Sequence, residues 1–210
     1  MGRTLVACAA FLVLAIGAAR WLTLDFNIWT AEGARRFEVA SAPVAAPDVT
    51  LDGPGLRDTR LPEVLAANQA VTIVDFIYTS CQTVCQVLGT GFQQLQARIE
   101  ADAWLKQRVR LLSISFDPAR DTTDVLRDHA DHLGADPAIW TFARIADQRQ
   151  LATLLDRFNV VVIPDGQGGY AHNAALLVVD RDARLVRIFD YSELDTALAY
   201  AVRLADRQVS

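Results

Sequence analysis

The sequence predicts an α/β domain with a central mixed sheet flanked by helices. Two runs, VTIVDFIY at 71–78 and VRLLSISF at 109–116, are rich in β-branched and aromatic residues and predict buried strands. Between them, apolar residues recur at roughly helical spacing over 87–99. A strand–helix–strand unit joins parallel strands of one sheet, so this order favours parallel pairs covered by helices on both faces.

The first two helices of the predicted domain follow the two strands. The helix after Cys85 is expected to continue to about Ala103. The segment DTTDVLRDHADHL, at 121–133, predicts the next helix, with Asp121 and Thr122 as candidate caps.

The last third of the chain continues the alternation of predicted strands and helices. Residues 147–158 predict an amphipathic helix, and AALLVVDRDARLVRIFD at 174–190 predicts two strands joined by a turn at 180–183. The final segment predicts a helix in which Ser192 and Asp195 have the spacing of a capping box, with Asp in place of the usual Glu.

The N-terminus has the composition of an export signal or a membrane anchor. After Arg3, the chain has no charge over 4–19, and Arg20 and Trp21 follow. This length suits the core of a signal peptide; it suits an uncleaved anchor if Arg20 and Trp21 lie at the membrane interface. A buried core helix is the alternative. With Arg3 inside, the rest of the chain faces the far side of the membrane.

These features divide the chain into three parts. Residues 1–24 are the predicted signal or anchor, 25–47 a membrane-proximal connector, and 48–210 the domain. The connector includes SAPVAAP at 41–47, which is expected to resist packing. The net charge of −5 and the absence of a clustered basic run exclude a nucleic-acid-binding surface.

The three cysteines point to chemistry rather than to a disulfide scaffold. Cys8 belongs to the export segment, so the exported domain carries only Cys81 and Cys85. A scaffold stapled by disulfides has more cysteines, spread through the chain. A cysteine pair directly after the first strand of a strand–helix unit suggests a thioredoxin-like fold.

The spacing of Cys81 and Cys85 allows three interpretations. If the helix begins near Cys81, the two residues are neighbours on one helical face, with Cβ atoms about 5–6 Å apart. A disulfide needs Cβ atoms about 3.8 Å apart, so a regular turn would distort to form one, whereas two sulfurs can bind one metal ion without distortion. A redox couple and a pair of inert core thiols remain the alternatives.

The three histidines differ as candidates for a third ligand. His129 and His132 lie among charged residues of a predicted helix, where a weak surface metal site or a simple solvated face would fit. His172 follows the Gly-rich segment IPDGQGGY, at 163–170, and precedes a predicted strand. It is either a site residue at the end of the sheet or an ordinary edge residue. Two thiolates and one imidazole favour copper(I) or zinc.

The motifs FIYTSCQTVC and DPARDT, with a histidine before a strand in the last third, resemble the Sco/SenC family. This resemblance implies a membrane-anchored, thioredoxin-like protein of the bacterial inner membrane, whose domain faces the periplasm. It implies one copper ion per chain, as copper(I) or copper(II), held by Cys81, Cys85 and His172. It also implies a role in cytochrome c oxidase assembly, by delivering copper to subunit II or another copper protein, or by reducing the cysteines of the subunit II site.

The chain departs from the family pattern at three positions. Gln82 and Gln86 stand where the family has proline, and Ala171 stands where an acidic residue precedes the histidine. These differences bear on copper affinity and redox potential. A membrane-tethered thiol–disulfide oxidoreductase using the same cysteines is the alternative function, and a copper-sensing module is a third. Whether the protein is an enzyme stays open at this point.

Overall fold

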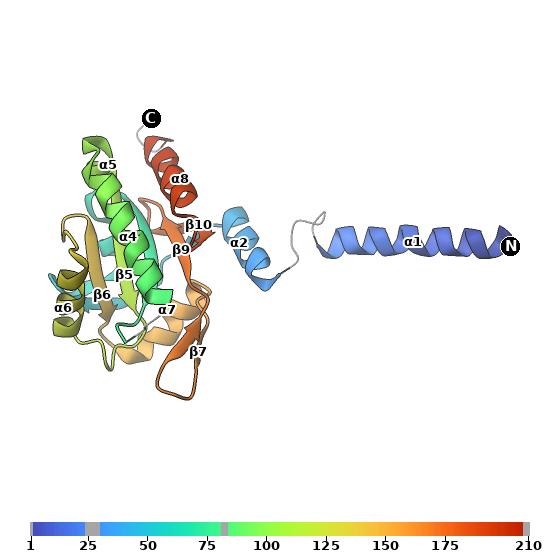
Figure 1. Cartoon of the computed structure of the whole chain (residues 1–210). Coiled ribbons are helices and arrows are strands. Elements are labelled where there is room, and N and C mark those ends of the chain that lie inside the picture. Colours follow the sequence, from blue (N-terminus) through green and yellow to red (C-terminus); the bar gives the residue numbers. More distant parts are fainter. Residues whose placement is uncertain (1, 24–29, 81–83, 208–210) are drawn as a thin grey trace.

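The computed structural model describes residues 2–23, 30–80 and 84–207, and the side chains of α4 from residue 88 onward. Its main feature is an eight-stranded mixed sheet with the strand order β1-β10-β9-β4-β5-β6-β2-β3 (Figure 1). The strands are β1 (Val44–Ala45), β2 (Thr50–Gly53), β3 (Leu56–Arg60), β4 (Val71–Ile77), β5 (Val109–Ser115), β6 (Trp140–Ile145), β9 (Ala175–Val179) and β10 (Arg184–Asp190).

The parallel pairs lie at the centre of the sheet. β4 pairs with β5 in parallel from Val71↔Val109 to Ile77↔Ser115, and β5 pairs with β6 in the same way. β9 lies antiparallel on the other side of β4. The carboxyl ends of β4 and β5 therefore meet at one edge of the sheet, as the strand–helix–strand pattern predicted, and the predicted fold class is confirmed.

Helices cover both faces of this sheet. Alternation along β4 sends Val74 and Phe76 into one core cluster and Ile73 and Ile77 into the other. The first cluster lies under α3 and α7, and the second under α4, α5, α6 and α8. The helices of the domain are α3 (Leu61–Ala66), α4 (Val84–Glu100), α5 (Ala103–Arg108), α6 (Thr123–Leu133), α7 (Leu151–Arg157) and α8 (Leu194–Arg207).

The β9–β10 hairpin and its turn agree with the sequence prediction, but the predicted cap of the last helix is wrong. The hydroxyl of Ser192 donates to the Asp190 carboxylate at 2.7 Å instead of capping α8, which begins two residues later at Leu194. The carboxylate of Glu193 accepts the backbone N–H of Asp190 at 2.8 Å. The side chains of Ser192 and Glu193 thus stabilise the turn at 190–193 that precedes α8, and not the first turn of the helix itself.

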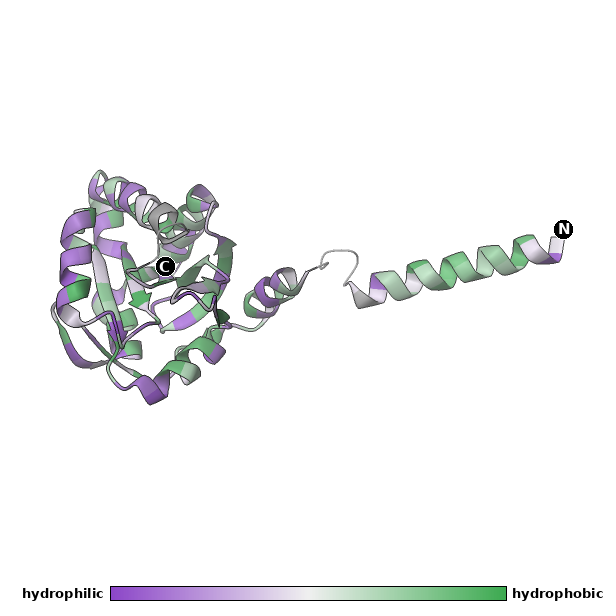
Figure 2. Cartoon of the chain, turned by 60° about the horizontal axis from the view of Figure 1, so that its bottom comes forward, coloured by the Kyte–Doolittle hydropathy of each residue, from purple (hydrophilic) through white to green (hydrophobic). Residues whose placement is uncertain are grey.

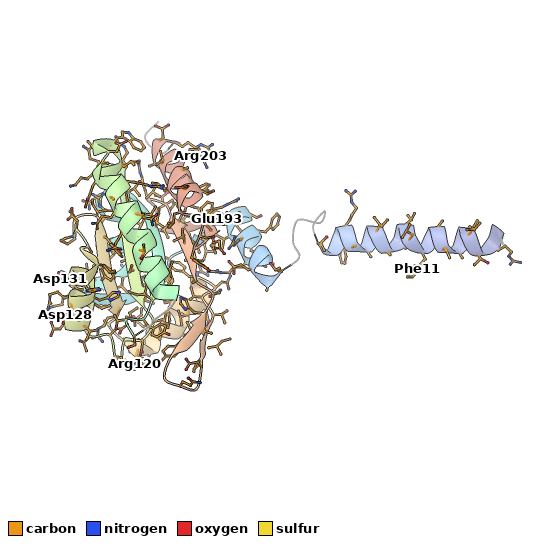
Figure 3. The ribbon with its side chains drawn as sticks, in the orientation of Figure 1. Phe11, Arg120, Asp128, Asp131, Glu193 and Arg203 are labelled. Carbon is orange, nitrogen blue, oxygen red and sulfur yellow. The ribbon has the colours of Figure 1, made fainter. Side chains whose placement is uncertain are left out.

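The predicted connector contains a helix, α2 (Ala31–Ser41), that packs on the domain. The Arg35 side chain is buried, and its guanidinium donates to the Phe158 carbonyl at 3.2 Å. Arg36 forms an ion pair with Glu193 at 3.3 Å, and Figure 3 labels Glu193 beside α2. The expectation that 41–47 resists packing is wrong, because β1 pairs with β10 within this segment.

The N-terminal helix α1 (Gly2–Leu22) has the character that the sequence predicted. Residues Gly2–Trp21 are long and apolar enough to cross a membrane, and none of this stretch is buried (Figure 2). The predicted boundary at residue 24 lies outside the described residues. The division into 1–24, 25–47 and 48–210 stays a prediction.

Asp75 is an unusual carboxyl group inside the sheet. It lies on β4, is 1% exposed, and pairs in register with Ser113 of β5, whose side chain hydrogen-bonds to it. Ser113 also accepts the indole N–H of Trp140 at 2.9 Å. Burial raises the pKa of Asp75 to about 7, because the hydrogen bonds offset only part of the desolvation of the carboxylate.

Candidate metal centre

The predicted cysteine ligands follow β4 in the sequence. Cys81 lies outside the described residues, and so does the side chain of Cys85, whose backbone lies in the first turn of α4. The chain enters this segment from Tyr78, which is 7% exposed, and from Thr79. The structure therefore describes the chain up to residue 80, three residues after β4 ends, and again from residue 84, where α4 begins.

His172 lies in a separate two-stranded sheet rather than in a loop. The strands β7 (Val162–Pro164) and β8 (Tyr170–His172) form a hairpin that projects from the domain (Figure 1). Val162 pairs with His172 in this hairpin, and the Asn173 side chain accepts the N–H of Val161 at 2.7 Å. The Gly-rich segment is thus the turn of a hairpin that carries His172.

The His172 imidazole is oriented by the strand that leads to the cysteines. The backbone of Phe76, on β4, hydrogen-bonds to the ring, whereas Nε2 is buried and has no partner among the described residues. The bonded nitrogen is therefore Nδ1, which donates to the Phe76 carbonyl and leaves the lone pair of Nε2 free. Burial lowers the pKa of His172, which favours the neutral, metal-binding form.

The imidazole packs against Phe116, one of three aromatic rings that contact one another. The Phe116 ring lies 5.1 Å from the His172 ring, centroid to centroid, and Tyr78 lies 5.3 Å from both Phe116 and Tyr170. The Tyr170 N–H donates to the Tyr78 hydroxyl at 3.3 Å. These rings and the Phe76 backbone place His172 at the carboxyl ends of β4 and β5.

Asp121 holds Thr79, two residues before Cys81 in the sequence. Asp121 is 1% exposed, and its carboxylate accepts the backbone N–H of Thr79 at 3.1 Å and the Thr79 hydroxyl at 2.6 Å. The Ser115 hydroxyl donates to the same carboxylate. The two candidate caps of α6 therefore have different roles. Thr122 is the N-cap, whereas Asp121 binds Thr79.

We expect the Asp121→Ala change to weaken the fold and any copper binding that uses the predicted cysteine ligands. It removes three hydrogen bonds and leaves the Thr79 and Ser115 donors unpaired, which costs about 3 kcal/mol of unfolding free energy. Because a freed cysteine segment is less well placed for a metal, copper affinity is expected to fall about 10-fold or more. Urea unfolding and copper(I) competition measure the two effects.

The control for this change is Asp124→Ala, one turn further along. Asp124 is exposed and its carboxylate accepts from Arg127 within the same helix, so its loss is expected to leave both quantities nearly unchanged. Equal effects of the two substitutions would contradict the role of Asp121 in holding the cysteine segment.

The other two histidines, His129 and His132, both lie on α6. His129 is half-buried on α6 and packs against Phe142, with ring centroids 5.8 Å apart, and burial lowers its pKa. His132 is exposed on the same helix. Among the side chains that the structure describes, no three His, Cys, Asp or Glu residues are close enough to bind one ion.

Three comparisons place the chain among known proteins. The family model SCO1/SenC matches residues 66–205. A SCO1 protein homolog of Bacillus subtilis is 26% identical over 127 residues, which is 60% of this chain and 63% of that protein, less than two thirds of its length.

Two solved structures share the fold. BsSco, described with a disulfide switch and as a member of the Sco family of cytochrome c oxidase assembly proteins, has a TM-score of 0.66 at 20% identity, covering 79% of this chain and 95% of that chain. The copper-bound ScoI of Bradyrhizobium japonicum has a TM-score of 0.61 at 21% identity, covering 76% of this chain and 99% of that chain.

Proposed function

The chain belongs to the SCO1/SenC family, and from this premise we propose that it is a copper-binding protein of cytochrome c oxidase assembly. The proposed ligands are the thiolates of Cys81 and Cys85 and the imidazole of His172. The observation that carries the proposal is the buried Nε2 of His172, which has no partner among the described residues while Phe76 holds the other ring nitrogen.

The proposed donor set suits copper(I). Thiolates and imidazole are soft or intermediate ligands, and copper(I) accepts three of them, whereas zinc normally takes a fourth. Copper is the cargo in this proposal, so binding must be reversible. As the acceptor protein we propose oxidase subunit II or another copper protein.

The chain's own residues keep this site assembled. The Phe76 carbonyl selects the tautomer of His172, and Asp121 holds Thr79 before Cys81. Both contacts are made by residues at the carboxyl ends of the central strands or just beyond them. The site therefore depends on the parallel pairing of β4 and β5 that brings these ends together.

We propose that α1 anchors the domain in the bacterial inner membrane, with the domain in the periplasm. The length and apolar character of Gly2–Trp21 support the anchor. Arg3 before this stretch supports the orientation, because positive charge favours the cytoplasmic side.

The alternative function is thiol–disulfide exchange without an obligatory metal. The disulfide switch described for BsSco, which shares this fold, favours keeping the alternative. It predicts reversible oxidation of Cys81 and Cys85 and an activity that does not depend on His172. The copper proposal predicts instead that the activity is lost when His172 is replaced.

A copper titration of the reduced full chain in detergent tests the proposal. We expect a sharp endpoint at one copper(I) per chain, lost in Cys81→Ser and in Cys85→Ser because each change removes one of the three ligands. Cys8→Ser is the matched control, since Cys8 is exposed on α1, and it is expected to keep the endpoint. A Cys81→Ser chain that still holds one copper tightly overturns the proposal.

A further inference from the structure

The loop after β5 contacts both segments that carry the proposed ligands. Its Asp121 holds Thr79 on the cysteine side, and its Arg120 reaches the hairpin that carries His172. Figure 3 labels Arg120 at the end of the domain from which this hairpin projects. The Asp121 contact is buried, whereas the Arg120 side chain is 43% exposed.

The Arg120 guanidinium makes three contacts that together fix its position. Its Nε donates to the carboxylate of Asp117, a residue that is itself only 6% exposed. Its Nη1 donates to the Gly168 carbonyl in the hairpin turn at 2.6 Å. Its carbon Cζ lies 5.4 Å from the centroid of the Tyr170 ring. The buried carboxylate therefore aims the guanidinium at the hairpin.

Two residues of the hairpin, Gly168 and Tyr170, contact the Arg120 guanidinium. Gly168 has a φ of 91°, a backbone conformation that favours glycine, and its carbonyl is the one that accepts from Arg120. Tyr170, which lies under the guanidinium, is two residues before His172 on β8, so both side chains leave the same side of the strand.

The base of the hairpin is held separately from its turn. Asn173 bonds across the strands to Val161 and Asn159, next to the domain. The outer side of the hairpin is open: Val161 and Ile163 are 53% and 58% exposed. Arg120 therefore supplies a polar contact at the far end of the hairpin, where a two-stranded sheet gains little stability from its own strands.

We propose that Arg120 is a positioning residue for His172: it holds the β7–β8 hairpin against the loop after β5, so that the imidazole stays beside Phe116. The inference rests on the proposed function only where it concerns copper. Arg120 itself touches no ligand atom among the described residues. Its effect on copper must pass through His172, whereas the effect of Asp121 passes through the cysteine segment.

The first test needs no copper. Diethyl pyrocarbonate modifies histidine rings, and mass spectrometry of the full chain in detergent gives the rate at each residue. We expect Arg120→Ala to raise the rate at His172 several-fold, because the hairpin opens more often and exposes Nε2, and to leave exposed His132 unchanged. Arg127→Ala, which removes an exposed arginine of α6, is the control.

An unchanged rate at His172 in Arg120→Ala overturns the inference, as does an equal rise in Arg127→Ala. Arg120→Lys is expected to restore little of the protection, because one ammonium group cannot reproduce the guanidinium fork that contacts Asp117 and Gly168 together. Full protection in Arg120→Lys would contradict the need for that fork.

The second test is a double-mutant cycle on copper(I) affinity. Arg120→Ala is expected to weaken binding about 10-fold in the native chain, as for loss of a group that orients a ligand, and to have no further effect in His172→Ala. Asp121→Ala is expected to weaken binding equally in both. An Arg120 effect that persists without His172 overturns the positioning role.

The two tests separate this inference from the proposed function. If His172→Ala leaves copper binding unchanged, the proposed ligand set fails, while the modification rates still decide whether Arg120 positions the histidine. If copper binding depends on His172 and the rates do not depend on Arg120, only the inference fails.

Discussion

Replacing His172 with alanine is expected to weaken copper(I) binding by about 100-fold or more, a loss at least as large as that from removing an outer-shell partner of a ligand. The change removes the buried Nε2 of His172, on β8, and leaves the two cysteines as the only proposed protein ligands. Competition against a copper(I) chelator of known affinity, with the reduced full chain in detergent, measures the change.

His129→Ala is the matched control for this substitution. Both histidines are half-buried, both pack against a phenylalanine ring, and burial lowers the pKa of both. His129 has no proposed ligand role, so its loss is expected to leave copper affinity unchanged. Equal losses in the two variants would show that general disturbance of the fold, rather than removal of a ligand, weakens binding.

Replacing Asp75 with asparagine is expected to stabilise the protein at neutral and alkaline pH. The pKa of Asp75 rises from 3.8 in the unfolded chain to about 7 in the folded protein, a shift worth about 4 kcal/mol. The folded state holds this proton more tightly than the unfolded state, so the stability it contributes is fully present below the unfolded pKa. That contribution is lost as the pH rises through the folded pKa.

The variant should therefore differ from the native chain in a pH-dependent way. At about pH 4 the two unfolding free energies are expected to be similar, and by about pH 8 asparagine is expected to be more stable by up to about 4 kcal/mol. Urea unfolding at several pH values measures the difference, and groups common to both proteins cancel in it. Thr72→Val, a buried change on the same strand, controls for effects without titration. A difference that does not grow with pH would contradict the raised pKa of this buried carboxyl group.

The strongest elements of the fold were predictable because their local patterns are strong. The runs at 71–78 and 109–116 are continuous, apolar and β-branched, and they became the central parallel pair β4 and β5. The β9–β10 hairpin followed from two apolar runs around a polar turn. These segments are buried on both faces, so tertiary packing reinforces the pattern that the sequence displays.

The strands on the far side of β5, namely β6, β2 and β3, were not predictable in the same way. The β2–β3 hairpin includes LRDTR at Leu56–Arg60, a strand with three charged residues and little alternation. β6 has Thr141 and Arg144 among its apolar residues. In both strands, backbone pairing with a neighbour determines the conformation, and such pairing depends on residues far away in the chain.

The contacts that arrange the candidate site also span long separations. Thr79 and Asp121 are 42 residues apart, and Arg120 and Gly168 are 48 apart. The sequence marked Asp121 as a helix cap because caps are local, whereas its actual partner lies just beyond the end of β4. His172 was identifiable from its place before a strand, but its bond to the Phe76 carbonyl was not.

That bond bears on the departure at Ala171. The family pattern has an acidic residue before the histidine, whereas Ala171 is exposed and pairs with Ile163 on the outer face of the hairpin. In this chain the backbone of Phe76 orients the imidazole, a role that a carboxylate often fills for a metal-binding histidine. A backbone carbonyl adds no negative charge beside the imidazole. Gln82 lies outside the described residues, and so does the side chain of Gln86.

X-ray absorption at the copper edge tests the proposed ligand set most directly, because it reports the atoms bound to the metal. For the copper(I)-loaded full chain, we expect two sulfur neighbours and one nitrogen neighbour, with the nitrogen lost in His172→Ala and retained in His129→Ala. A spectrum without sulfur neighbours, or one that His172→Ala leaves unchanged, would contradict copper binding by Cys81, Cys85 and His172.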